Sequence, residues 1–282
     1  MLADKTPQDR YIDADGLRLH YLDWGNEAAP PMILLHGFTG HAHTWDTFAQ
    51  AMCDQFHVLA LDQRGHGDSD WAKDGAYTIE DHATDIAEFH DQLMLDPVVL
   101  IGLSMGGRNA IMYTGIHPGK VEKLVIVDIG PDIDPRGAER VRRTAAEAPE
   151  EFASIDEAMA YLRRYAARTS AAAEAAMRHR VEHGVKRLPH GKYTWKYDKF
   201  LRDQRRQGGT PQADLWPVVR RIKVPTLILR GSESDVFSPD TARRMHELIP
   251  GSRLVEIPGA GHSIPADAPE AFERTVREFL GA

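Results

Sequence analysis

One serine, Ser104, stands between two glycines in the segment "VVLIGLSMGGRNA" (98–110), after an apolar run and before a helix-like run. In a sharp strand-to-helix turn, the residues two before and two after such a serine pack together and must be small. Gly102 and Gly106 hold these positions. The turn would strain the serine backbone and lift its hydroxyl out of the sheet. The alternative is an ordinary glycine-rich turn. Residues elsewhere in the chain that could act with the Ser104 hydroxyl distinguish the two interpretations.

A serine hydroxyl is a weak nucleophile until a base accepts its proton. The best-placed base is His262 in "PGAGHSIPADAPE" (258–270), because it follows the last strand-like run. The oxyanion that forms in acyl transfer also needs N–H donors that are already in place. We expect Met105, at the start of a helix, to supply one N–H group. Phe38, in the loop after "MILLHG" (32–37), is our candidate for the other.

Two aspartates at strand ends are candidates for the carboxylate that orients the histidine. Asp128 ends the run "KLVIVDI" (123–129), and Asp235 lies in "RGSESDVFSP" (230–239). Either carboxylate would fix the histidine tautomer and stabilise the imidazolium ion. The aspartate that does not serve this role would cap a loop through nearby backbone N–H groups.

The elements that position these residues follow an alternating pattern. Apolar runs of strand length recur, and several are apolar throughout, which is typical of strands buried on both faces of a parallel sheet. Helix-like segments separate them, so we predict a doubly wound α/β sheet. The first two strand-like runs, with "DADG" (13–16) as a tight turn, are expected to form an antiparallel hairpin. The expected strands are 17–25, 31–37, 56–62, 97–104, 123–129, 225–231 and 252–258, and the expected helices are 44–54, 78–94, 106–117, 240–249 and 268–280.

The alternation stops at Gly130. From there to about Asp214 no alternation of strands and helices is found. Residues 137–185 are rich in Ala, Glu and Arg and predict successive helices, and we interpret the charges of the insertion as a solvated face. We interpret this segment as a cap over the carboxyl edge of the sheet. The predicted division is a core of residues 1–130 and 215–282 and a helical cap of residues 131–214.

The composition excludes several classes of partner. The 282 residues carry a formal net charge of -8 and no basic run, so we expect neither nucleic acid nor an anionic membrane as a partner. The single cysteine, Cys53, cannot form an intrachain disulfide, which favours a reducing compartment, and we expect the cytoplasm. The polar N-terminus is unlike a signal peptide. No stretch approaches the roughly 20 apolar residues that a membrane span needs.

Four short motifs occur in a fixed order: "LLHGFTG" (34–40), "LDQRGHGDS" (61–69), "GLSMGG" (102–107) and "PGAGHS" (258–263). Together they resemble the α/β-hydrolase family over nearly the whole chain outside the cap. The resemblance implies an eight-stranded, mostly parallel sheet with helices on both faces, an inserted helical cap, a Ser–His–acid triad and no cofactor.

Two further resemblances narrow the choice of acid. "VIVDIGP" and "HGKYTWKYDKF" resemble small bacterial carboxylesterases and their mitochondrial relatives, and "DQRGHGDSD" with "GRNA" resembles 2-(acetamidomethylene)succinate hydrolases, which cleave an amide. In both groups the acid tends to lie where this chain has Asp128. Family members more commonly carry it three residues after the glycine of the penultimate strand, where this chain has Ser234 and Asp235 comes one later. We therefore favour Asp128 and keep Asp235 as the alternative.

A serine at the elbow fits acyl transfer, whereas the haloalkane dehalogenases and epoxide hydrolases of this fold carry aspartate there. We expect a carboxylesterase that acts on a small-molecule ester. One alternative is an amidase or lactonase of the same fold that acts on a small carboxylate-bearing substrate. A non-catalytic ligand receptor of this fold is the alternative from a different class. The oligomeric state is not predicted.

Substrate choice is expected to come from the cap and from the loops. Trp195, Tyr197 and Trp216 are candidates for an apolar lining, although packing of the cap on the sheet explains each equally well. Arg108, just past the elbow, is a candidate for binding a substrate carboxylate, although a surface position on the helix is the more common one.

The remaining titratable residues are interpreted as structural. We expect Asp62 and Arg64 to form an ion pair that holds a loop near the sheet edge. We expect no metal site, because we recognise no motif in which two histidines at ligand spacing enclose a carboxylate, and because "HAH" (41–43), a possible metal pair, has the features of an exposed loop. His179, His183 and His190, in the insertion, are expected to face solvent.

Overall fold

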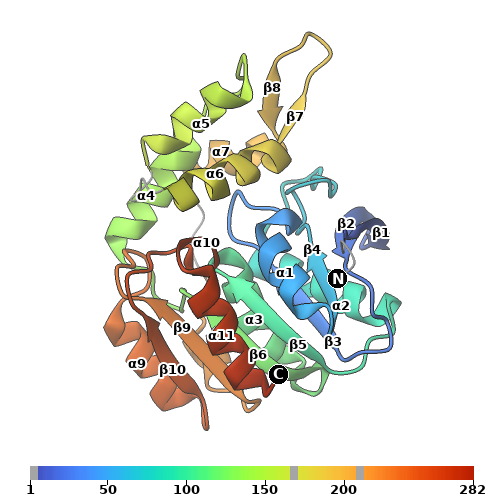
Figure 1. Cartoon of the computed structure of the whole chain (residues 1–282), viewed down its shortest axis with the longest axis vertical. Coiled ribbons are helices and arrows are strands. Elements are labelled where there is room, and N and C mark those ends of the chain that lie inside the picture. The colour runs from blue at the N-terminus through green and yellow to red at the C-terminus, as the bar shows by residue number, and fades with distance from the viewer. Residues whose placement is uncertain (1–5, 166–170, 208–212) are drawn as a thin grey trace.

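The computed structural model describes residues 6–165, 171–207 and 213–282. An eight-stranded sheet lies at its centre, in the order β1-β2-β4-β3-β5-β6-β9-β10 (Figure 1). The pairs β1–β2 and β2–β4 are antiparallel, and every other neighbouring pair is parallel. The predicted mostly parallel sheet is therefore confirmed. Its strands are β1 (Gln8–Ala14), β2 (Leu17–Asp23), β3 (Pro31–Leu35), β4 (His57–Leu61), β5 (Val98–Leu103), β6 (Val121–Val127), β9 (Thr226–Gly231) and β10 (Arg253–Ile257).

Helices cover both faces of this sheet (Figure 1). Two separate hydrophobic clusters result, one on each face. Within the described ranges, no helix combines the length and the apolar character that crossing a membrane requires. One face carries η1 (Ala42–Trp45), α1 (Asp46–Met52), α10 (Ile264–Asp267) and α11 (Pro269–Leu280), and the other carries α2 (Ile79–Gln92), α3 (Met105–Ile116), α8 (Trp216–Val219) and α9 (Pro239–Leu248).

Strand β5 shows why the central runs are apolar throughout. Leu100 packs into the cluster that contains α2 and α3, whereas Val99 and Ile101 pack into the cluster that contains α1 and α11. Successive side chains of a strand point to opposite faces, so a strand covered on both sides needs an apolar residue at every position. All six residues of β5 are buried.

The N-terminal hairpin differs from the sequence prediction. Strand β2 pairs with β1 around Asp15 and Gly16, whose positive φ angles of 49° and 76° suit a two-residue Asp-Gly turn. The predicted partner of β2, the run 31–37, forms β3 instead and pairs in parallel with β4 and β5. Sequence reasoning misses β1 because only Ile12 and Ala14 of its seven residues are buried.

The segment that follows β6 forms a cap above the carboxyl ends of the strands (Figure 1). It has its own hydrophobic cluster, which includes Phe152, Tyr161 and Trp195. The prediction of an all-helical insertion is wrong in one respect, because a two-stranded sheet interrupts the helices. The boundaries 131–214 stay a prediction. The cap elements are α4 (Pro135–Ala146), α5 (Ile155–Arg163), α6 (Ala171–Gly184), β7 (Val185–Arg187), β8 (Tyr193–Trp195) and α7 (Lys199–Arg206).

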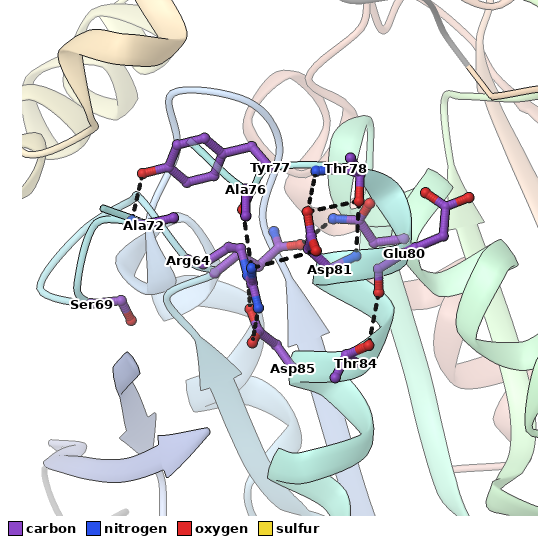
Figure 2. A network of polar contacts seen from close by, with 12 residues as sticks. Arg64, Ser69, Ala72, Ala76, Tyr77, Thr78, Glu80, Asp81, Thr84 and Asp85 are labelled. Carbon is purple, nitrogen blue, oxygen red and sulfur yellow. Dashed lines mark hydrogen bonds and ion pairs between the residues drawn. The ribbon is translucent and has the colours of Figure 1, made fainter. Parts of the chain in front are cut away.

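A buried ion pair anchors the loop that follows β4 (Figure 2). Arg64 Nε and Nη2 donate to the two carboxylate oxygens of Asp85, on α2, at 2.6 and 2.7 Å, and Nη1 donates to the Ala76 carbonyl at 3.0 Å. The Arg64 and Asp85 side chains are 3% and 2% exposed. The predicted pairing of Arg64 with Asp62 is therefore wrong. Asp62 instead accepts a hydrogen bond from the buried His20 at 2.7 Å.

Replacing Asp85 with alanine is expected to lower the free energy of unfolding by about 3 kcal/mol, because the buried Arg64 guanidinium loses both of its carboxylate hydrogen bonds. Urea denaturation measures the change. The control is Asp91→Ala, which removes the exposed ion pair with Lys120 and should cost less than about 1 kcal/mol. Equal losses in the two variants would contradict the structural role of Asp85.

Candidate active site

Ser104 lies at the tip of a tight turn between β5 and α3. Its backbone has φ 54° and ψ -116°, a combination that residues other than glycine rarely adopt and that stores strain. The Ser104 N–H group donates to the Val127 carbonyl at 3.1 Å, which ties the turn to the end of β6. The serine is only partly buried, and it lies at the carboxyl edge of the sheet.

The glycines on either side of Ser104 allow this turn to close. A Cβ atom on Gly102 would lie 2.3 Å from the carbonyl oxygen of Gly106, and a Cβ atom on Gly106 would lie 2.3 Å from the carbonyl oxygen of Leu35. Neither position can therefore carry a side chain without a change in the backbone. The turn is a strained elbow of the kind that the sequence predicts, and not an ordinary glycine-rich turn.

His262 lies between Ser104 and Asp128. Its Nε2 atom is 2.9 Å from Ser104 Oγ, and its Nδ1 atom is 2.8 Å from Asp128 Oδ2. The loop that carries His262 follows β10 and is held against the loop after β9, because Glu233 N–H donates to the Ala260 carbonyl at 2.9 Å. Residues from the ends of β5, β6 and β10 thus form one hydrogen-bonded chain.

Asp128 is fully buried and its carboxylate has several protein donors. Asp128 Oδ1 accepts from the Gly231 N–H group at 2.8 Å, and Asp128 Oδ2 accepts from Ser234 Oγ at 2.5 Å as well as facing His262. These donors hold the carboxylate in place beside His262. Ser234 holds the position where family members more commonly carry the acid, and sequence reasoning gave it no role.

Asp235 lies nearby with a different partner. Arg140, on cap helix α4, donates to both of its carboxylate oxygens at 2.6 and 2.7 Å. This guanidinium lowers the pKa of Asp235. Within the described part of the chain, no hydrogen bond joins Asp235 to His262. The structure therefore brings Asp128 to the histidine, and it uses Asp235 to join the loop after β9 to the cap.

The loop after β3 packs directly against the elbow. A Cβ atom on Gly37 would lie 3.2 Å from Ser104 Cβ, and Gly40 N–H donates to the Gly37 carbonyl at 2.9 Å. His36 fixes this loop, because its Nε2 atom accepts from the Gln63 N–H group at 3.0 Å. Burial lowers the pKa of His36 to about 4, so the ring is neutral and can accept this hydrogen bond.

The two predicted oxyanion donors flank Ser104. Met105 is the first residue of α3, so its N–H group has no acceptor within the helix. Phe38 follows Gly37 in the loop that touches Ser104, and its N–H group has no acceptor among residues 6–165, 171–207 and 213–282. Both N–H groups are thus available to a ligand at Ser104.

Two of the predicted lining residues make packing contacts. Trp195 is buried within the cap, where its ring meets Phe152 edge-on at 4.9 Å between centroids. The indole N–H group of Trp216 donates to the Asp132 carboxylate at 3.1 Å. For both tryptophans the structure favours the packing interpretation.

Arg108 is buried and bonded to the backbone. Its Nη1 atom donates to the carbonyls of Gly130 and Pro131, each at 2.9 Å, and its Nη2 atom donates to the carbonyl of Ala213 at 3.0 Å. Burial lowers the pKa of Arg108 to about 10. These bonds join the first and last parts of the cap segment to α3, and they occupy the groups that would otherwise bind a substrate carboxylate.

Tyr197, the third predicted lining residue, links the cap to the loop after β3. Its ring lies 6.2 Å from the Phe38 ring, centroid to centroid. Two arginine side chains of α7 lie close to these rings. Arg205 Cζ lies 4.8 Å from the Phe38 ring centroid, and Arg202 Cζ lies 5.3 Å from the Tyr197 ring centroid.

A third arginine, Arg180 of α6, donates from Nη2 to Thr39 Oγ1 at 2.6 Å. Burial lowers the pKa of Arg180 and of Arg205, and Nε and Nη1 of Arg202 are buried without a hydrogen-bond partner among the described residues. In the described part of the chain, none of the three forms an ion pair with a carboxylate. The interpretation of the cap charges as a solvated face is wrong for these three, which we call the cap arginines.

A hollow of about 810 Å³ lies elsewhere, at the amino ends of the strands, where Pro31, His57 and Pro97 are among its lining residues. Ligands of open α/β sheets bind at the opposite edge, outside the carboxyl ends of the strands. The hollow contains none of the residues grouped around Ser104, so we do not assign it to the functional site.

Comparison with known proteins agrees with this geometry. The model of a family described as the alpha/beta hydrolase fold matches residues 30–269. Esterase Rv0045c of Mycobacterium tuberculosis is 33% identical, over 92% of this chain and 85% of its own length. The 2-(acetamidomethylene)succinate hydrolase of Mesorhizobium japonicum is 28% identical, over 97% of this chain and 95% of its own length. A crystal structure of E-2-(acetamidomethylene)succinate hydrolase superposes with a TM-score of 0.87 at 28% identity and covers 98% of this chain and 100% of that chain.

Proposed function

Since the chain belongs to the α/β-hydrolase family and is a hydrolase, we propose that it is a serine carboxylesterase that acts through an acyl-enzyme intermediate. The observation that carries the proposal is the continuous chain of hydrogen bonds from Ser104 Oγ through His262 to Asp128. A hydroxyl, an imidazole and a buried carboxylate in this order form an activated nucleophile.

Each group has one role in the proposed reaction. His262 Nε2 accepts the Ser104 hydroxyl proton as Oγ attacks the ester carbonyl carbon. The N–H groups of Phe38 and Met105 donate to the resulting oxyanion. His262 then gives the proton to the departing alkoxide, which leaves an acyl group on Ser104. His262 next accepts a proton from water, whose oxygen attacks the acyl carbonyl carbon. His262 returns this proton to Ser104 Oγ as the bond between Oγ and the acyl group breaks, which releases the carboxylic acid. Asp128 keeps the His262 proton on Nδ1 throughout, which leaves Nε2 free to accept the serine proton.

The test is a series of initial rates on p-nitrophenyl esters from acetate to decanoate, with p-nitroanilides of the same acyl groups run in parallel. We expect turnover of the esters. The acyl chain length that gives the highest kcat/KM indicates the size of the acyl-binding site. Faster cleavage of the anilides would favour the amidase instead. Binding of the esters without turnover would favour the receptor.

The cap arginines favour a second, narrower function. Arg205 places positive charge beside Phe38, Arg180 beside Thr39 and Arg202 beside Tyr197, although the chain as a whole carries a net charge of -8. Guanidinium groups that lack a protein carboxylate are suited to bind one on a ligand. The second candidate is therefore an amidase, lactonase or esterase for a small substrate that bears a carboxylate. One similar protein is named for such a substrate, 2-(acetamidomethylene)succinate.

Replacing Arg205 with methionine tests this second function. We compare p-nitrophenyl butyrate with mono-p-nitrophenyl succinate, an acyl chain of the same length that ends in a carboxylate. The variant should lose about tenfold or more in kcat/KM on the succinate and little on the butyrate, because a hydrogen bond to a charged group contributes about 1.5–3 kcal/mol. The control is Lys199→Met, because Lys199 is also a cationic residue of α7 and its side chain is exposed. Equal losses on both esters would rule out charge recognition by Arg205.

A further inference from the structure

A cluster of three histidines and one aspartate lies where the cap meets the core. His43 and Asp46 come from η1 and the start of α1, and His179 and His183 come from α6. One potential ligand atom from each of the four residues lies within 4.8 Å of the others. The sequence prediction that His179 and His183 simply face solvent is wrong, because their rings pack on His43. We call these four residues the His/Asp cluster.

The spacing of the four residues suits joint ligation. His179 and His183 are four apart on α6, so their side chains lie on the same face of the helix. Two histidines at this spacing can hold one metal ion together, as in known zinc-binding helices. His43 and Asp46 are three apart and approach from the core, with His43 Nδ1 2.9 Å from Asp46 Oδ2. Each side of the interface therefore contributes two ligands.

Several polar atoms of the cluster lack a protein partner. Asp46 Oδ2 is shared by His43 and His179, at 2.9 and 3.0 Å, whereas Asp46 Oδ1 is buried and has no hydrogen-bond partner in the part of the chain that the structure describes. His183 stacks on His43 at 3.8 Å between ring centroids and has no hydrogen bond within the described residues.

We propose that the His/Asp cluster binds a divalent transition-metal ion such as Zn²⁺ and thereby ties the cap to the core. Three imidazole nitrogens and one carboxylate oxygen are a donor set typical of four-coordinate zinc, and imidazole also suits Co²⁺, Ni²⁺ and Cu²⁺. Ca²⁺ and Mg²⁺ prefer oxygen ligands throughout and do not fit. The His43, Asp46 and His179 side chains are 22%, 23% and 43% exposed, so an ion can enter from solvent.

The site is separate from the proposed chemistry. Ser104 has His262 as its partner, and none of the four cluster residues is hydrogen-bonded to either. With four protein ligands the ion would have a closed coordination shell, which is typical of structural rather than catalytic zinc. The inference does not depend on which bond the enzyme cleaves.

A second group of potential ligands, formed by His20, Asp62 and Asp68, does not carry the same inference. The Asp62 carboxylate already accepts from His20 Nδ1 at 2.7 Å and from the backbone N–H groups of Ala42 and Asp68 at 2.6 and 2.9 Å. Its oxygen atoms are satisfied by the protein, so the group is explained as a structural network.

The test is equilibrium binding of Co²⁺ to the full chain after treatment with a chelator and dialysis. Tetrahedral Co²⁺ with nitrogen and oxygen ligands gives intense visible absorption bands, and added Zn²⁺ should remove them by displacement. We expect one equivalent of Co²⁺ per chain. The double variant His179→Ala/His183→Ala should bind at least about tenfold more weakly, since even loss of an outer-shell partner costs metal sites about 10–100-fold. His190→Ala is the control, because His190 lies in the cap, outside the cluster, and contacts Glu151.

Thermal unfolding gives an independent measurement. Zn²⁺ should raise the Tm of the wild-type chain and of His190→Ala but not that of the double variant, because an ion that binds only the folded state stabilises it. Circular dichroism checks that each variant is folded, and Asp46→Asn provides a second cluster variant that keeps all three histidines. Wild-type affinity in the double variant and in Asp46→Asn would overturn the proposal. The absence of saturable binding to the wild-type chain would overturn it as well.

Discussion

Replacing Ser104 with alanine is expected to lower kcat for the best ester by about 10⁶-fold, as in other Ser–His–Asp sites. The variant keeps the oxyanion donors and the binding surface, but it has no atom that can form the acyl-enzyme. The elbow should still form, because the close contacts that define it involve Gly102 and Gly106 and not the serine side chain. The measurement is a set of initial rates on the ester series. Circular dichroism checks that the variant is folded.

A residual rate above about 1% of wild type would contradict the nucleophile assignment, because a site that has lost its nucleophile falls much further. A second preparation by a different purification route guards against a contaminating esterase. Uncatalysed hydrolysis in buffer is subtracted from both proteins.

Replacing Asp128 with asparagine is expected to lower kcat by about 10⁴-fold. An amide that replaces the carboxylate would favour the wrong tautomer of His262 and would not stabilise the imidazolium ion. The loss should not come from unfolding, because the amide oxygen can still accept from the Gly231 N–H group and hold the side chain in place. Rates on the best ester and urea denaturation of the same samples separate the two effects.

Asp235→Asn is the matched comparison. Its carboxylate is bonded to Arg140 and has no hydrogen bond to His262 within the described chain, so we expect a loss of about tenfold or less. A greater loss in Asp235→Asn than in Asp128→Asn would reassign the acid. Similar losses in both variants would show that the two aspartates act together.

The core of the fold could be predicted because each of its strands and helices has a recognisable pattern of apolar residues within its own short segment. Strands such as β5 are buried on both faces and are therefore apolar at every position, and helices with one apolar stripe separate them. Strand β1 is mostly exposed and β7 and β8 have three residues each, so none of them has a run that stands out from its surroundings.

The site could be predicted only in part, for a related reason. The glycines around Ser104 and the loop around His262 have local patterns, whereas the choice between Asp128 and Asp235 depends on how two loops fold against each other. The cap arginines belong to helices whose sequences resemble those of solvent-exposed helices. Only the position of the cap over Phe38 gives these arginines a role. The expectation that no two histidines enclose a carboxylate at ligand spacing is wrong, because "HRVEH" (179–183) has this pattern. Its partners in the core lie more than 130 residues away in the sequence.

The most direct test of the central claim is to trap the acyl group on the enzyme. Wild-type protein is mixed with excess p-nitrophenyl acetate, and the reaction is followed before the steady state and quenched in acid. If deacylation is the slower step, as the acyl-enzyme scheme allows, p-nitrophenol appears in a burst equal to the enzyme concentration. Peptide mass spectrometry should then find one acetyl group on the peptide that contains Ser104, and none in Ser104→Ala. Turnover of the ester with the acetyl group on another residue, or with equal labelling of both proteins, would contradict the proposed mechanism.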